Sequence, residues 1–202
     1  MKQSATIVVL VTVCLLSAAL AQTAQPATTT LTPEEREAAL KLFRTTHDHF
    51  TKSISGLSQK QWTFKPAPDR WSVAEVAEHI TVAETTITGL IQHPLMQSPA
   101  APEKREQVKG NDQLVLQRMP DRSHNAQAPE ILRPTGRWAT QADLTKAFED
   151  ARKANMEYIR TTNDDLRDHF FEHPAFGTLD GCQWLLLLAT HSARHTAQIE
   201  EV

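Results

Sequence analysis

Two stretches of the chain begin with the same helix-capping pattern, a Thr or Ser followed three residues later by Glu. Thr32-Pro33-Glu34-Glu35 opens the first, and Ser72-Val73-Ala74-Glu75 opens the second. In this pattern the hydroxyl accepts a hydrogen bond from the Glu backbone, while the Glu side chain accepts one from the cap residue. Apolar residues at helical spacing follow both patterns. We therefore predict helices over Pro33–Ser55 and from Ser72 to about Gln92.

Two further amphipathic stretches complete the pattern. One starts at Thr140 and places Leu144, Phe148 and Ile159 on one side, and the other runs from about Gly181 to the end of the chain. No alternation of apolar and polar residues is long enough to predict a strand. The sequence therefore predicts an all-α fold, a four-helix bundle.

The segment 93–139 between the second and third predicted helices contains six prolines. It is too long for a hairpin turn, and a connection of this length can carry the chain back along the bundle. The second and third helices would then run parallel, as in bundles with a crossover connection. Within the segment we expect a short helix near Lys104–Gln117.

The first residues have the pattern of an export signal. Lys2 supplies a positive charge, Ile7–Leu20 is almost entirely apolar, and Ala19-Leu20-Ala21 offers a cleavage site. We expect a signal peptide over 1–21, a flexible spacer over 22–31 and one domain over 32–202. This organisation predicts a secreted or periplasmic protein without stable membrane association after cleavage. The alternative is an uncleaved membrane anchor.

The charge of the chain excludes one class of partner. There are 21 Lys and Arg residues against 24 Asp and Glu, a formal net charge of −3, and basic residues do not gather in a block. Nucleic acid is therefore not expected as a partner. Signal cleavage would leave Cys182 as the single cysteine, so stability must come from packing or from a metal.

Two histidines, His191 and His195, lie four residues apart on the last predicted helix, on the same face as Gln198. An i, i+4 pair can supply two imidazoles from one helix to a metal. His79, at the edge of the inner face of the second helix, is the candidate third ligand. Three imidazoles leave a coordination position for water, as in catalytic zinc sites. The alternative is that these histidines are hydrogen-bonded in the core or solvated.

Three blocks of the sequence resemble the DinB-like superfamily of bacterial proteins. They are KPAPDRW at 65–71, SVAEVAEH at 72–79 and WLLLLATHSARHTAQIEE at 184–201. The resemblance implies a four-helix bundle with a long link after its second helix. It also implies a divalent metal held by His79, His191 and His195. Some relatives resemble thiol-dependent transferases or isomerases, and others are described only as metal-dependent hydrolases. An export signal is a departure that argues against cytosolic thiols as co-substrates.

Other polar residues have simpler interpretations. Glu75 is explained by its capping box, Glu78 points about 100 degrees away from His79, and Cys182 lies too far along its helix to share an ion. Gln198 can support a ligand histidine from outside the coordination sphere. His47 and His49 are expected to be solvated helix residues, and His173 a structural residue of a loop.

The favoured hypothesis is an exported metal-dependent enzyme acting on a small-molecule substrate by hydrolysis or group transfer. Imidazole ligands suit zinc first, with nickel or iron as alternatives. Because HSARH lacks the glutamate of the HExxH motif, a peptidase is not supported. One rival is a protein whose metal only braces the bundle or is cargo. Another is a metal-free helical domain that binds another protein. A homodimer is left open.

Overall fold

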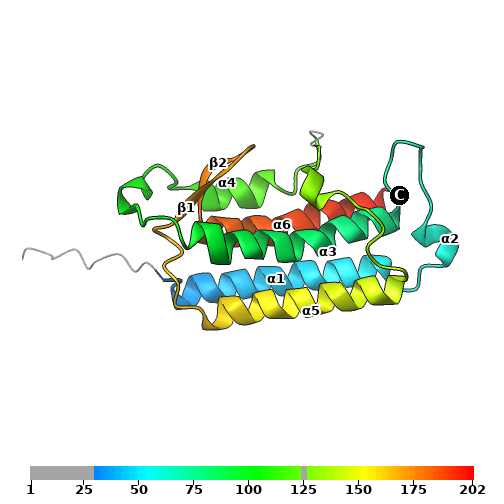
Figure 1. The fold of residues 1–202 in the computed structure, drawn as a ribbon, viewed down its shortest axis with the longest axis horizontal. Coiled ribbons are helices and arrows are strands. Elements are labelled where there is room, and N and C mark those ends of the chain that lie inside the picture. The colour runs from blue at the N-terminus through cyan, green and yellow to red at the C-terminus, as the bar shows by residue number, and fades with distance from the viewer. Residues whose placement is uncertain (1–29, 124–126) are drawn as a thin grey trace, which may run out of the picture.

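A computed structural model describes residues 30–123 and 127–202 of the chain, and within them four long helices form a bundle (Figure 1). The helices are α1 (Pro33–Ile54), α3 (Val73–Leu90), α5 (Gln141–Thr161) and α6 (Gly181–Glu200). The predicted four-helix bundle is confirmed. The expected signal peptide (1–21) and most of the expected spacer (22–31) lie outside the described residues.

The predicted capping signals set the helix starts. Thr32 Oγ1 accepts a hydrogen bond from the backbone N–H of Glu35, whose carboxylate accepts one from the Thr32 N–H. Ser72 and Glu75 make the same reciprocal pair at the start of α3. The start of α6 has the equivalent arrangement with an Asp180 cap. Local sequence therefore fixes where three of the long helices begin.

Helices α1 and α3 are diagonal in the bundle, and each packs against both α5 and α6. Side-chain pairs give the directions: Glu84 of α3 meets Arg152 of α5, and Thr88 meets Asn155 further along both helices. Helices α3 and α5 therefore run parallel, as their colours in Figure 1 also show. The start of α1 lies at the end of α5, where the Arg36 guanidinium donates to the Ile159 carbonyl.

Short helices occupy the connections. The α1–α3 loop contains α2 (Gln59–Trp62), and α3 continues into the π-helix η1 (Ile91–Leu95). The α3–α5 connection then forms η2 (Pro102–Lys104), α4 (Asn111–Arg118) and η3 (Glu130–Leu132). The predicted short helix near Lys104–Gln117 corresponds to α4, but the prediction placed its start too early. Gly110, with φ +89°, interrupts the helical backbone directly before α4. Helix α4 packs on α6.

The absence of strands was a wrong expectation. Residues Phe170–His173 (β1) and Gly177–Asp180 (β2) pair as an antiparallel hairpin directly before α6. Strands of four residues are too short to show alternation, and the turn depends on Gly177 at φ +69°. His173 therefore closes a strand and does not lie in an open loop. Its ring packs on those of Trp184 and Phe176.

Apolar side chains fill two zones of the bundle, one toward each end. Phe43, Leu185 and Ile159 belong to the first, and Phe50 and Phe148 to the second. All five are fully buried. In the part of the chain that the structure describes, no helix has both the length and the apolar character needed to cross a lipid bilayer.

Candidate metal centre

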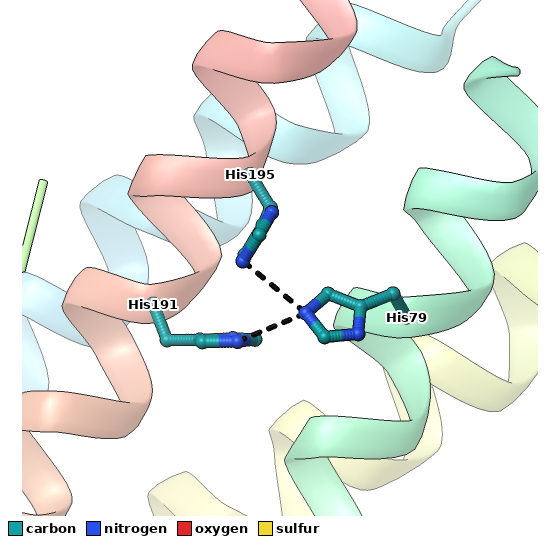
Figure 2. Close-up of side chains that lie close together, drawn as sticks. All are labelled: His79, His191 and His195. Carbon is teal, nitrogen blue, oxygen red and sulfur yellow. Dashed lines mark hydrogen bonds between the residues drawn. The ribbon is translucent and has the colours of Figure 1, made fainter. Parts of the chain in front are cut away.

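The structure brings the three predicted histidines together between α3 and α6 (Figure 2). His191 and His195 project from successive turns of α6, and His79 faces them from α3. Nε2 of His79 lies 3.1 Å from Nε2 of His191 and 3.2 Å from Nε2 of His195. His79 and His191 are buried, and His195 is partly exposed. The open side of the cluster is therefore at His195.

Hydrogen bonds on the far side of two rings determine their tautomers. Nδ1 of His79 lies 2.8 Å from the Leu132 carbonyl oxygen, and Nδ1 of His195 lies 2.8 Å from Oε1 of Gln198. Both oxygens can only accept, so both Nδ1 atoms carry the proton. In the neutral rings, each Nε2 therefore presents a lone pair. Two lone pairs then face each other across 3.2 Å.

His191 cannot resolve this conflict. If its proton is on Nε2, it can donate to one neighbouring nitrogen but not to both. Its Nδ1 is buried and has no hydrogen-bond partner. Whichever tautomer it takes, at least one buried nitrogen remains unsatisfied, at a cost of about 1–3 kcal/mol. The cluster therefore has too few protons for its acceptors.

Additional protons are not supplied by ionisation near neutral pH. Burial lowers the pKa of His79 below its usual value. Burial and the neighbouring His195 and His79 lower the pKa of His191 well below the usual value. Burial, together with His79, lowers the pKa of His195 to about 3. All three rings are therefore neutral, which is the form in which imidazole binds a metal.

A divalent cation fits this donor set. Tetrahedral zinc with nitrogen ligands at about 2.0–2.1 Å separates those nitrogens by roughly 3.3 Å, close to the 3.1 and 3.2 Å observed. The Leu132 carbonyl and Gln198 take the outer N–H groups of two ligands, as the outer partners of metal-bound histidines generally do. His79, His191 and His195 are thus the residues that could hold an ion.

Glu78 supports the centre indirectly, and sequence reasoning missed this role. The residue is 5% exposed, and its carboxylate accepts N–H hydrogen bonds from Thr135 at 2.7 Å and Gly136 at 2.9 Å. A third, from Arg137, is 3.3 Å long. These bonds hold the segment that follows Leu132, whose carbonyl orients His79. The hydrogen bonds of Glu78 go to residues 135–137 and not to the histidines, so it anchors the loop that positions one of them.

Gln198 lies where the sequence placed it, beside His195 on α6. Its Oε1 also lies 3.5 Å from a guanidinium nitrogen of Arg122, whose other nitrogens pair with Glu201 at 2.6 and 2.8 Å. The chain near residue 122 therefore passes close to the exposed side of the centre. No feature of residue 122 in the sequence indicated this contact, because it joins positions 76 residues apart.

The other candidates lie elsewhere. His47 contacts Glu149 and Asp48, and His49 contacts Glu200, all on helix surfaces. Glu75 caps α3 as predicted and pairs with Lys65. Burial raises the pKa of the Cys182 thiol above its usual range, so this cysteine is not a nucleophile.

A second group of possible metal ligands, Glu35, Asp112 and Cys182, is already served by a cation. The guanidinium of Arg167 pairs with Glu35, and with Asp112 and Asp180 at 2.9 and 2.8 Å. This guanidinium already pairs with both carboxylates of the group. Among the described residues, the histidine cluster is therefore the better metal site.

Comparison with known proteins agrees with this fold. A family model described as DinB superfamily matches residues 42–199, most of the chain, and the protein belongs to this superfamily. The uncharacterized protein YuaE of Bacillus subtilis (strain 168) is 22% identical over 149 residues, which are 74% of this chain and 87% of YuaE.

A similar structure has also been solved. YfiT from Bacillus subtilis matches with a TM-score of 0.50 at 13% sequence identity, over 85% of this chain and 87% of YfiT. YfiT is described as a probable metal-dependent hydrolase with an unusual four-helix bundle topology. At this identity the likeness establishes the fold alone.

Proposed function

We propose that the protein binds one divalent metal ion through His79, His191 and His195 and uses it in hydrolysis or group transfer on a small-molecule substrate. The observation that carries the proposal is the pair of Nε2 lone pairs of His79 and His195, which face each other across 3.2 Å. A cation between them turns this repulsion into two bonds. Zinc is the first candidate, and nickel and iron(II) are alternatives.

The surroundings favour a catalytic ion over a closed structural one. Three protein ligands leave a coordination position free, and the partial exposure of His195 gives access to it. When bound there, a divalent ion polarises a substrate atom or lowers the pKa of a water toward about 7. The description of YfiT, which shares the fold, supports the same class of activity. Leu132 and Gln198 keep two ligand rings in the required tautomer.

Elemental analysis of protein purified without a histidine tag tests the metal site. Wild-type protein reloaded with zinc, nickel or iron(II) should hold one ion per chain. His79→Ala, His191→Ala and His195→Ala should each abolish stoichiometric metal. His49→Ala and His173→Ala, which remove imidazoles outside the cluster, should leave it unchanged. Full metal occupancy in His79→Ala would contradict the proposed site.

A panel of small chromogenic esters, amides and phosphates tests catalysis. Turnover of at least one class should disappear after treatment with a chelator and return when the ion is restored. The three alanine variants should stay inactive after the same treatment. If the metal is bound stoichiometrically but a water ligand does not exchange and no substrate is turned over, the ion is a brace for the bundle.

We also propose that the protein is exported, on the basis of the apolar segment and the Ala19-Leu20-Ala21 pattern. N-terminal sequencing of protein from a secreting host should find Gln22 as the first residue. Membrane-retained protein that starts at Met1 would show instead that the segment is an anchor.

A further inference from the structure

An open cleft lies at the start of α3, beside the candidate metal centre. Its volume is about 380 Å³, within the usual range for small-molecule pockets of about 300–1,000 Å³. The side chains that matter for its chemistry come from the loop before α3, from α3 itself and from the segment after η3. They are Lys65, Asp69, Arg70, Trp71, Glu75 and Arg133.

Two residues connect the cleft to the centre. The indole ring of Trp71 packs against the imidazole of His79, with 5.2 Å between ring centroids. Arg133 directly follows Leu132, whose carbonyl accepts the hydrogen bond from His79 Nδ1. The wall of the cleft and the support of His79 are thus built from the same short segments. Trp71 therefore lies between a molecule in the cleft and a ligand of the proposed ion.

The charged groups of the cleft do not cancel. The Lys65 ammonium lies 2.8 Å from the Glu75 carboxylate, which also caps α3. The remaining charges that line the cleft are two positive ones, on Arg70 and Arg133, and one negative one, on Asp69. Within the described part of the chain, neither guanidinium takes part in a salt bridge, and Arg133 donates only through Nε to the Ala128 carbonyl. Arg70 also lies close enough to Glu201 to help lower the pKa of that carboxyl, but the Glu201 carboxylate is paired with Arg122. The residues that line the cleft therefore have an excess of one positive charge, and neither guanidinium is held in a salt bridge with a described residue.

The proposed ion adds to this positive potential. Three neutral imidazoles leave the charge of a divalent cation uncompensated by its ligands. A guanidinium presents its N–H groups in a fork that matches the oxygens of a carboxylate or a phosphate. Positive charge lining a cleft raises the local concentration of anions. Shape and charge at this place both favour a small anion.

We propose that the cleft binds the carboxylate or phosphate group of an anionic substrate through Arg70 and Arg133, and that the reacting part of the substrate lies at the ion. The proposal names the substrate class of the proposed metal-dependent function and rests on it. Trp71 separates the two parts of the site and provides a flat wall for the body of the substrate. Uncharged and cationic small molecules are poor ligands of such a site.

Two probes test the cleft independently of the metal. Benzoate represents a carboxylate and inorganic phosphate represents a phosphate, and benzyl alcohol is the uncharged control. Each is titrated into full-length protein from which metal has been removed, so that an ion cannot bind the probe. The indole N–H signal of Trp71, assigned with a Trp71→Phe variant, reports binding by nuclear magnetic resonance.

We expect at least one anion to shift the Trp71 signal saturably and benzyl alcohol to leave it unchanged. Arg70→Ala and Arg133→Ala should each weaken anion binding tenfold or more, and Arg70→Lys should weaken it less. Arg44→Ala, which removes an exposed guanidinium from α1, should have no effect. The tighter of the two anions identifies the charged group of the substrate.

These measurements distinguish a failure of the proposed anion cleft from a failure of the proposed metal site. If the protein holds no metal but binds an anion through Arg70, the cleft is correct and the metal-dependent function is wrong. If metal is bound but neither anion shifts Trp71, or Arg70→Ala and Arg133→Ala bind as tightly as wild type, the cleft proposal is wrong. Metal content must stay at one ion per chain in both arginine variants, because neither residue is a ligand.

Discussion

Two buried polar clusters join α3 to its neighbours, and they satisfy their polar atoms in opposite ways. The first is the histidine centre. The second, which we call the Arg152 cluster, consists of Thr46, Glu84, Thr88, Arg152 and Asn155. In the Arg152 cluster donors meet acceptors, whereas in the histidine centre acceptors meet acceptors. The Arg152 cluster is nearly complete within the protein, whereas the histidine centre leaves a buried nitrogen without a partner, which the proposed cation would relieve.

The bonds of the Arg152 cluster show this completeness. Arg152 donates to Glu84 at 2.6 Å and to Thr46 at 2.7 Å, and Asn155 donates to the other Glu84 oxygen at 2.8 Å. Only Nε of Arg152 has no partner, and the guanidinium lies over the rings of Phe43 and Phe148. The cluster lies between the two apolar zones and ties α1, α3 and α5 together. Its role is structural.

The largest effect is expected from breaking the Arg152 cluster. Arg152→Ala leaves the Glu84 carboxylate buried without its counter-ion and should lower the free energy of unfolding by about 3–5 kcal/mol, measured by urea denaturation at neutral pH. The matched control Arg160→Ala removes an exposed guanidinium from the same helix and should change it by less than about 0.5 kcal/mol. Equal losses in the two variants would contradict the structural role.

The pH dependence of the Arg152→Ala variant sharpens this test. Burial raises the pKa of Glu84, and in the wild type Arg152 opposes the shift. Without Arg152, the folded-state pKa rises further above the unfolded value. The stability of the variant should therefore be greatest below the unfolded pKa of about 4.5 and fall as the pH rises through the folded-state pKa. Arg152→Met combined with Glu84→Gln should remove this pH dependence and recover part of the stability.

The histidine centre should respond in the opposite way to an apolar substitution. In the wild type, an ion at a hundredfold excess over its dissociation constant should add about 2.7 kcal/mol to the free energy of unfolding. His191→Leu should abolish this gain. In the metal-free state, however, His191→Leu should be more stable than wild type by about 1–3 kcal/mol, because it removes a buried nitrogen without a partner.

Paired urea denaturation curves, with metal and with a chelator, measure both the gain in stability from the ion and the stability difference between the metal-free proteins. If the metal-free wild type is more stable than metal-free His191→Leu, the three rings satisfy one another without an ion. The histidine centre would then be complete without an ion, as the Arg152 cluster is.

The sequence predicted those features of the helices and of the histidine centre that depend on local patterns. Thr32 and Ser72 marked helix starts because a capping box is contained within four residues. The i, i+4 spacing placed His191 and His195 on one face, and a bundle brings that face against His79. The resemblance to the DinB-like superfamily independently implied the same three residues.

The remaining features depend on contacts between distant residues. The pattern of α5 does not mark Arg152 as buried, since a charged residue on a helix is usually solvated. The support of His79 by Leu132 joins positions 53 residues apart through a proline-containing segment without periodicity. The β1–β2 hairpin is too short to produce an alternating pattern. Such contacts are determined by tertiary packing, which a single sequence does not display.

A smaller effect is expected from loosening the loop that orients His79. Glu78→Ala removes the acceptor of the Thr135 and Gly136 N–H groups, so the Leu132 carbonyl is held less firmly. Metal affinity, measured by competition with a chromogenic chelator, should fall about 10–100-fold, the usual cost of losing an outer partner of a ligand. Glu78→Gln keeps an acceptor oxygen and should recover part of the affinity. Unchanged affinity in Glu78→Ala would show that the Leu132 carbonyl is held in place without Glu78.

The smallest effect should come from Gln198, which holds one ligand from the partly exposed side of the centre. Gln198→Ala removes the acceptor of the His195 Nδ1–H, but water can replace it there, so metal affinity should fall by about tenfold, the lower end of the usual range. Gln198→Glu keeps the hydrogen bond and adds a negative charge, which makes the imidazole a stronger donor to the ion. This variant should bind metal more tightly than wild type in the same competition assay. The histidine centre, unlike the Arg152 cluster, would then gain from an added carboxylate. Its three rings are neutral, so the proposed ion would be the charge that the carboxylate balances. If Gln198→Glu bound metal more weakly than Gln198→Ala, Gln198 would not be a partner of His195 in the metal-bound protein.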